Sequence, residues 1–213
     1  MIDSYRHKGM RRKLAVTIKN KGIKDQRVLA AIEKIPRHFF LDSSFTEIAY
    51  QDKPFPIGSG QTISQPYTVA FQTELLQVEK DEKILEVGTG SGYQACVLLE
   101  MGARVYSIER HRTLYKKASQ LLSEMGYLPK LFYGDGYKGL PTFAPFDKIL
   151  VTAGAPEIPE ELLKQLKTGG LMVIPLGGSG NQLMTTIRKL SDTDFEKKEH
   201  GYFRFVPLLG KKA

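Results

Sequence analysis

From residue 83 onward, short apolar runs alternate with segments whose apolar residues recur at helical spacing. A brief run of β-branched or apolar residues bounded by turn residues is typical of a buried strand, and apolar positions three and four apart are typical of a helix. The pattern predicts strands at residues 83–87, 104–108, 130–133, 145–152 and 169–175. It predicts helices between them at residues 93–99, 113–122 and 159–166. This alternation indicates an α/β fold with a mostly parallel, doubly wound sheet.

The last part of the chain has a different pattern. Residues 182–190 and 203–208 are predicted to be strands joined by a polar turn around residues 192–194, with no helix between them. Two strands without a crossover helix must pair antiparallel. The sheet is therefore predicted to end in an antiparallel hairpin, which gives a Rossmann-like fold with one antiparallel edge.

Residues 1–60 are predicted to form an appendage to this sheet. Two amphipathic helices are expected at residues 4–19 and 25–33, and residues 42–63 lack periodicity and are expected to form a long loop packed through its aromatic side chains. A helix is expected at residues 68–76, with Ser64 well placed as its N-cap and also able to turn its hydroxyl toward a ligand, since the two roles are compatible. We expect one domain, residues 1–213, with its core in residues 61–213.

Three glycines follow the first predicted strand of the core. Gly88, Gly90 and Gly92 lie at alternate positions between that strand and a helix, where glycine allows positive φ and the helix start presents free N–H groups. Twenty-one positions after Gly88, the next strand ends at Glu109, whose carboxylate could accept both hydroxyls of a ribose. Tyr93 stands where a dinucleotide fingerprint needs its third glycine, which argues against an NAD-dependent oxidoreductase.

The same edge of the sheet collects a further acid. Asp135 lies between two glycines after the third predicted strand, and the carboxyl ends of parallel strands meet at one edge. There it could meet an adenine, although a residue of this type between glycines is also typical of a turn. Glycine-rich and acidic strand ends that converge in this way favour an enzyme over a non-catalytic binding module.

The net charge of +8 suggests a nucleic-acid partner, but its distribution does not. Residues 1–27 contain nine Lys or Arg and two Asp, a net charge of +7, which leaves +1 for the rest of the chain. A nearly neutral body is unlike a domain that follows phosphates, and the basic residues are expected to form a solvated helical face. Residues 151–156 also lack the Asn/Asp-Pro-Pro-aromatic motif of amino-group DNA methyltransferases. An RNA or DNA methyltransferase is kept as the alternative function.

Other compositional features restrict the location and the chemistry. Cys96 is the single cysteine and is expected to be a small buried hydrophobe, which fits a reducing compartment. The longest apolar run, residues 28–32, is far too short to cross a membrane, and a cytoplasmic monomer is expected. The four histidines are scattered along the chain, so no metal site is expected.

The motif G-x-G-x-G, with Glu86 before it and Glu109 at the end of the next strand, resembles the first motif of class I S-adenosylmethionine-dependent methyltransferases. Five stretches resemble one family within this class, the protein-L-isoaspartate O-methyltransferases. They are residues 60–67 (GQTISQPY), 85–94 (LEVGTGSGYQ), 134–136 (GDG), 145–152 with 156–159 (PFDKILVT, PEIP) and 204–208 (RFVPL). The first and last are the most specific to the family.

The resemblance implies that the chain uses S-adenosylmethionine, releases S-adenosylhomocysteine, and methylates the free carboxylate of isoaspartyl residues in damaged proteins and peptides, giving an ester that collapses to succinimide. It implies Ser64 as the catalytic residue, and peptide contacts from Ser64, Tyr67 and Val206. The residues that it assigns to the cofactor are Gln61, Thr62, Ile63, Glu86, Gly88, Thr89, Gly90, Ser91, Glu109, Arg110, Asp135, Gly136 and Thr152.

The absence of a candidate base agrees with this chemistry. A carboxylate is already ionised near neutral pH, so its methylation needs no proton abstraction. Catalysis then depends on placing one oxygen in line with the methyl group and on excluding water. The hypothesis that follows gives Ser64 the task of hydrogen-bonding and aiming the carboxylate.

Overall fold

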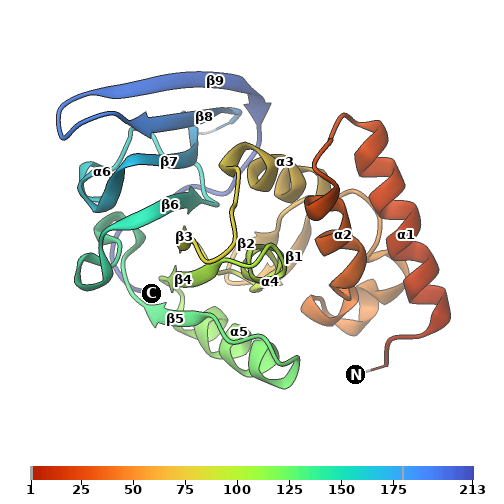
Figure 1. Ribbon diagram of the computed structural model, residues 1–213. Helices are drawn as coiled ribbons and strands as arrows, with labels where there is room; N and C mark the ends of the chain where they lie inside the picture. Colours follow the sequence, from red (N-terminus) through yellow and green to blue (C-terminus); the bar gives the residue numbers. More distant parts are fainter. Residues whose placement is uncertain (1, 179) are drawn as a thin grey trace.

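The computed structural model describes residues 2–178 and 180–213, and over these residues its centre is a seven-stranded sheet of order β5-β4-β3-β6-β7-β8-β9 (Figure 1). The strands are β3 (Lys83–Val87), β4 (Arg104–Glu109), β5 (Lys130–Tyr133), β6 (Phe146–Val151), β7 (Leu166–Leu176), β8 (Gln182–Lys189) and β9 (Phe195–Phe203). Strands β3 to β7 are parallel, and β8 and β9 add antiparallel to β7. The predicted Rossmann-like fold with an antiparallel hairpin is confirmed.

The order of the strands determines where a ligand can bind. From β3 the chain moves outward to β4 and β5, then crosses back so that β6 pairs with the other side of β3. Ligands of such sheets bind beyond the carboxyl ends of the strands where the order reverses. In this chain that place is the gap after Val87 and Val151.

Helices cover both faces of the sheet. They are α1 (Tyr5–Asn20), α2 (Gln26–Lys34), α3 (Pro66–Leu76), α4 (Tyr93–Glu100), α5 (Arg112–Glu124) and α6 (Glu160–Gln165). Alternate strand residues face opposite sides, so Ile84 joins the apolar cluster under α1 to α4, and its neighbour Leu85 joins the cluster under α6. Cys96 on α4 is fully buried in the first cluster, as predicted.

Several predicted boundaries were wrong. The second strand of the hairpin is residues 195–203 and not 203–208; residues 204–208 follow this strand and form a single bridge, between Pro207 and Gly154. The sequence of β9 after Phe195, EKKEHGYF, is charged, as is common in an exposed edge strand. It therefore lacks the alternation of apolar and polar residues by which a strand is recognised. Strand β7 begins at Leu166, where α6 had been expected to end.

The segment predicted as a loop, residues 42–63, is ordered. It contains a 3₁₀ helix (Ser43–Ile48) and a hairpin of β1 (Phe55–Gly58) and β2 (Gln61–Ile63). Ser64 is not the N-cap of the next helix, because α3 begins at Pro66 and its cap position is Gln65. The carboxylate of Asp52 accepts from the Tyr67 N–H at 2.8 Å in the first turn, a contact no local pattern could reveal.

Five of the nine Lys and Arg residues at positions 1–27 pair with acids of the protein, so these residues do not form only a solvated face. Arg6, Arg12 and Lys21 contact Glu47, Glu33 and Asp52. Arg11 is buried and binds both oxygens of Asp3 at 2.7 and 2.8 Å. The pairs of Arg6, Arg12 and Lys21 fasten α1 to later segments, and that of Arg11 fastens it to the residues before the helix. Together they neutralise part of the charge that suggested a nucleic-acid partner.

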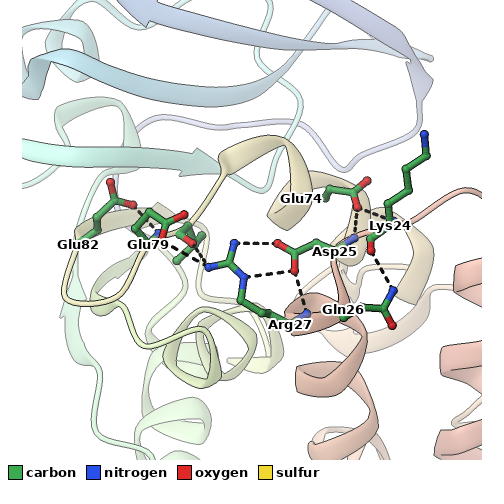
Figure 2. Close-up of polar contacts among 8 residues, drawn as sticks. Lys24, Asp25, Gln26, Arg27, Glu74, Glu79 and Glu82 are labelled. Atoms are coloured by element: carbon green, nitrogen blue, oxygen red, sulfur yellow. Dashed lines mark hydrogen bonds and ion pairs between the residues drawn. The ribbon is translucent and has the colours of Figure 1, made fainter.

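Figure 2 shows how α2 is fastened to the core. Oε1 of Glu74, on α3, accepts the backbone N–H groups of Lys24 and Asp25, both at 2.6 Å. Asp25 is the N-cap of α2 and also binds Arg27, whose guanidinium donates to the Val78 carbonyl at 3.1 Å. The start of α2 is therefore tied to both α3 and the segment that follows it.

Glu74→Ala is expected to lower the free energy of unfolding by about 2 kcal/mol, because two hydrogen bonds to a charged, half-buried acceptor are lost. Glu74→Gln keeps an acceptor oxygen and should cost less than half as much. Urea unfolding of both variants checks this. Equal losses would show that the two hydrogen bonds do not carry the effect.

Candidate active site

A cavity lies at the predicted place, beyond the carboxyl ends of β3, β4 and β6. One wall is the glycine loop that follows β3, and the opposite wall is the end of β2 with Ser64. The residues that line it and were expected at the cofactor or substrate are Gln61, Thr62, Ile63, Ser64, Gly88, Thr89, Gly90, Ser91, Glu109, Arg110, Gly136, Thr152 and Val206. Residues from six separate stretches of the chain thus meet at this edge of the sheet.

The glycine loop is held by the strand beside it. The N–H of Gly88 donates to the Ile108 carbonyl at 2.9 Å, and the Thr152 hydroxyl after β6 donates to the Gly88 carbonyl at 2.7 Å. The loop therefore bridges β4 and β6 across the point where the strand order reverses. Helix α4 begins directly after the loop at Tyr93, whose N–H donates to the Ser91 hydroxyl oxygen at 3.3 Å.

Glu109 lies where the second strand ends. One carboxylate oxygen accepts from the Gly90 N–H and the other from the His111 N–H, both at 2.8 Å. The side chain is only 4 % exposed, yet it lines the cavity. A carboxylate fixed on two amides is a rigid acceptor for ligand hydroxyls.

Glu86, a predicted cofactor residue, is outside the cavity. It is fully buried in β3, where its Oε2 accepts from the Ser107 hydroxyl, and Ser107 is 2.6 Å from the Thr89 hydroxyl in the glycine loop. Burial, with a smaller effect from Glu109, raises the pKa of Glu86 to about 8, against the lowering effect of the Ser107 hydrogen bond. Glu86 is thus a protonated support behind the loop near neutral pH.

Glu86→Gln should remove a pH dependence of stability. The folded pKa of Glu86, about 8, is above the ordinary value of 4.5, so its contribution is complete below pH 4.5. Above pH 4.5 the contribution of Glu86 to the free energy of unfolding falls by about 1.4 kcal/mol per pH unit, until the pH exceeds the pKa of Glu86 in the folded protein. In urea unfolding at pH 5 to 8, the variant should gain stability relative to the wild type as pH rises. A difference that is constant with pH would contradict this.

Asp135 also lies outside the cavity, although its neighbour Gly136 lines it. Both of its oxygens accept backbone N–H groups, from Tyr137 at 3.0 Å and from Lys211 at 2.8 Å. The second contact comes from residues 209–213, which also bind Arg110 and close this end of the cavity. Asp135 therefore fastens the end of the described chain over the site.

A second groove opens from the first. Thr62, Ser64, Thr152 and Val206 line both, so the two meet around the Ser64 side chain. The expected peptide residue Tyr67 lies in the second groove only. There it forms an aromatic cluster with Phe71 and Phe203, with ring centroids 4.9 to 6.3 Å apart.

Val206 stands at the junction on the extended segment that follows β9. Its carbonyl accepts from the Gly154 N–H at 2.9 Å, which leaves its own N–H as the group that could bond a peptide. Of the described residues lining the second groove, Lys21 and Arg204 are basic and none is acidic, although Lys21 is paired with Asp52 outside this lining. The groove is electrostatically suited to a negatively charged ligand.

Sequence reasoning missed some lining residues. Tyr93 and Gln94 line the first cavity, and a signal was available because they open the helix after the glycine loop. Lys21 and His200 line the groove, and no local sequence signal marks them. Lys21 is the C-cap of α1, and His200 lies on β9, a strand whose bounds were predicted wrongly. Long-range packing alone brings them there.

Two histidines expected to be scattered in fact meet. The rings of His7 and His38 lie 3.9 Å apart, and their nitrogens are within 4.8 Å of an Asp3 oxygen. These groups have protein partners: Asp3 binds Arg11, and the ring nitrogens of His38 contact Tyr50 and the Ile2 carbonyl. We interpret this cluster as a polar contact that supports the N-terminal helices.

In the described residues no helix is long and apolar enough to cross a membrane.

A doubly wound sheet with a glycine loop after its first core strand and an acid ending the next defines a class I S-adenosylmethionine-dependent methyltransferase. Within this class, residues 9–213 match the family described as protein-L-isoaspartate(D-aspartate) O-methyltransferase, and the chain belongs to that family.

Individual relatives support this family membership. The chain is 62 % identical over 213 residues to the protein-L-isoaspartate O-methyltransferase of Christiangramia forsetii and 60 % identical to that of Flavobacterium johnsoniae, with 100 % of both chains covered in each case. A solved protein-L-isoaspartate O-methyltransferase has a TM-score of 0.85 at 31 % identity, covering 94 % of this chain and 66 % of that one. A putative one from Plasmodium falciparum, in complex with S-adenosyl-L-homocysteine, has a TM-score of 0.81 at 26 % identity, covering 93 % and 98 %.

Proposed function

We propose that the chain transfers the methyl group of S-adenosylmethionine to the free carboxylate of L-isoaspartyl residues in damaged proteins and peptides, with the first cavity as the donor site and the second groove as the acceptor site. The activity is that of the family to which the chain belongs. The observation that carries the division of roles is the junction of the two spaces at Ser64.

The residues of the first cavity fit the donor. A Cβ at Gly88 would lie 2.4 Å from the Thr152 hydroxyl, so the loop is closed to side chains on that side and offers backbone to a ligand. Glu109 is proposed to accept the ribose hydroxyls, and the backbone around Gly136 to border the adenine. Gln61, Thr62, Ile63 and Thr152 are proposed to surround the amino acid end. When bound, S-adenosylmethionine supplies an electrophilic methyl group on a cationic sulfonium.

The acceptor side is proposed to work through hydrogen bonding and charge. Ser64 donates its hydroxyl hydrogen to the substrate carboxylate and so aims one oxygen at the donor. Arg204 gives the groove a positive charge for an acidic substrate, while the charge of Lys21 is paired with Asp52. Tyr67 provides an apolar wall, and the Val206 N–H pairs with the peptide backbone. No base is needed because the carboxylate is already ionised.

The product is a methyl ester, whose methoxy group leaves far more readily than an oxygen of the free carboxylate. The next backbone amide nitrogen can attack it with loss of methanol to form a succinimide, and hydrolysis of that ring returns some normal aspartate. The protein supplies only the first of these steps. Nothing in the family match favours the RNA or DNA methyltransferase alternative.

We further propose that residues 1–213 act as one domain and as a monomer in the cytoplasm, without a nucleic-acid partner. Both spaces are lined by residues of one chain, so no second copy is required to complete them. The N-terminal cations that could meet phosphate are partly engaged by acids of the same chain. Sedimentation of the purified protein measures the oligomeric state.

The proposed activity is tested with methyl-labelled S-adenosylmethionine and two peptides of one sequence, one with an isoaspartyl and one with a normal aspartyl linkage. Base-labile label is expected on the isoaspartyl peptide alone, because an ester forms only on the misplaced carboxylate. Equal labelling of both peptides, or labelling of added RNA or DNA, would contradict the proposal.

A further inference from the structure

Arg37 is a charged residue in an unusual environment. It opens the 3₁₀ helix Arg37–Phe40 after α2 and is 0 % exposed. Its hydrogen bonds go to main-chain carbonyls and not to carboxylates: Nε donates to Ala49 at 3.1 Å, and Nη2 donates to Lys53 at 3.2 Å and to Ser64 at 2.9 Å. Burial lowers its pKa to about 10, so the guanidinium stays charged at neutral pH.

Burying the Arg37 guanidinium lowers the stability of the fold unless another requirement retains it. Taking a guanidinium out of water without a carboxylate partner is unfavourable, and an apolar side chain of similar size usually packs at lower cost. Among the described residues, Nη1 of Arg37 has no hydrogen-bond partner at all. Arg11 is the contrasting case, since it is also buried but binds Asp3 through two oxygens.

The three carbonyls that Arg37 holds have a common position in the fold. Ala49 and Lys53 precede the β1–β2 hairpin, and Ser64 directly follows it. A single guanidinium therefore ties together the two ends of the hairpin whose second strand forms the acceptor-side wall of the cavity. The link to Ser64 is the shortest of the three.

Arg37 also reaches the donor side. Its Cζ lies 5.0 Å from the centroid of the Tyr93 ring, and Tyr93 is the first residue of α4, directly behind the glycine loop. Tyr93 lines the donor cavity, as Ser64 does. The guanidinium thus lies between the wall that carries Ser64 and the helix that supports the glycine loop.

Asp52 fixes the residues that directly follow Ser64. Its carboxylate accepts from the Gln65 side chain at 3.0 Å and from the Tyr67 N–H at 2.8 Å. The backbone is therefore fixed by a cation at Ser64 and by an anion just beyond it. Methyl transfer requires its reacting atoms to be aligned closely, and small displacements cost large factors in rate.

We infer that Arg37 is a positioning residue for methyl transfer, which sets the place of Ser64 relative to the donor cavity by holding its carbonyl and by packing on Tyr93. This rests on the proposed role of Ser64. The guanidinium touches neither donor nor acceptor and acts through the backbone that carries the hydroxyl. Its effect is therefore expected in the rate of transfer and not in the affinity for the donor.

The test compares Arg37→Lys, Arg37→Gln and, as matched control, Arg11→Lys in the full chain. Arg37→Lys and Arg37→Gln cannot reach three carbonyls, so kcat on an isoaspartyl peptide should fall about tenfold or more, with the Kd for S-adenosylhomocysteine within about twofold of wild type. Arg11→Lys should lower the melting temperature and leave kcat unchanged, because the residues that Arg11 bonds, Asp3, Glu33 and Tyr50, line neither the donor cavity nor the acceptor groove.

A combination with Ser64→Ala separates positioning from general support. If Arg37 acts through Ser64, adding Arg37→Lys to Ser64→Ala should lower kcat by less than about twofold further. Fully additive losses, a kcat near wild type in the folded Arg37 variants, or loss of cooperative unfolding in both of them would overturn the inference. Wild-type labelling of the isoaspartyl peptide is measured in the same assay, so failure of the proposed function is seen separately.

Discussion

Gly88→Ala is expected to abolish measurable binding of S-adenosylhomocysteine and to lower the free energy of unfolding by about 2 to 5 kcal/mol. Gly88 has φ +100°, which L side chains rarely adopt, and the added Cβ would lie 2.4 Å from the Thr152 hydroxyl oxygen. Thr152 cannot yield freely, because its hydroxyl donates to the Gly88 carbonyl at 2.7 Å and lies 3.0 Å from the Val87 carbonyl oxygen. The glycine loop must therefore move, and with it the wall of the donor cavity.

Gly22→Ala is the control for this result. Gly22 has a similar φ of +109°, but a Cβ there would meet nothing within 4 Å. It should show only the conformational cost, about 1 to 2 kcal/mol, with unchanged donor binding. Calorimetric titration with S-adenosylhomocysteine and urea unfolding measure both effects. Wild-type donor affinity in Gly88→Ala would show that the cavity described is not the donor site.

Ser64→Ala is expected to slow methyl transfer by about one to two orders of magnitude. A hydrogen bond to a charged group contributes roughly 1.5–3 kcal/mol, and each 1.4 kcal/mol corresponds to about a factor of ten in rate. The Ser64 side chain lies at the junction of the two spaces, so the loss should appear in kcat on the isoaspartyl peptide. Donor affinity should stay within a few-fold of wild type.

Ser59→Ala is the matched control, because Ser59 lies at the tip of the same hairpin and its hydroxyl contacts Thr113 at 3.1 Å. It lines neither the donor cavity nor the acceptor groove, and its activity should equal that of the wild type. Initial rates over a range of peptide concentrations separate kcat from KM. If Ser64→Ala keeps its activity within a few-fold, the aiming role is wrong.

The parts of the fold that the sequence predicts well are those determined by local pattern. Each buried parallel strand, such as β3 (KILEV) or β6 (FDKILV), contains a short β-branched or apolar run bounded by turn residues, so its place can be read without knowledge of its partners. The glycine loop is similar, because tight backbone turns depend on residue type. Glu109 follows from the rule that the carboxyl ends of adjacent parallel strands meet.

The parts that could not be predicted depend on contacts between distant residues. Asp52 and not Ser64 serves the start of α3, because the chain folds back through the β1–β2 hairpin. Strand β9 carries charged residues at a sheet edge and so lacks an apolar alternation. Glu86 was placed at the cofactor from its position before the glycine loop, yet its side chain points into the sheet to Ser107.

The central claim is that one continuous space holds the donor on the glycine-loop side of Ser64 and the isoaspartyl carboxylate on the other. A crystal structure of the protein with S-adenosylhomocysteine and an isoaspartyl peptide tests it most directly. The account predicts the cofactor sulfur and a peptide carboxylate oxygen on opposite sides of the junction lined by Thr62, Ser64, Thr152 and Val206, with the Ser64 hydroxyl on that oxygen. Cofactor bound elsewhere, or a peptide carboxylate remote from Ser64, would contradict it.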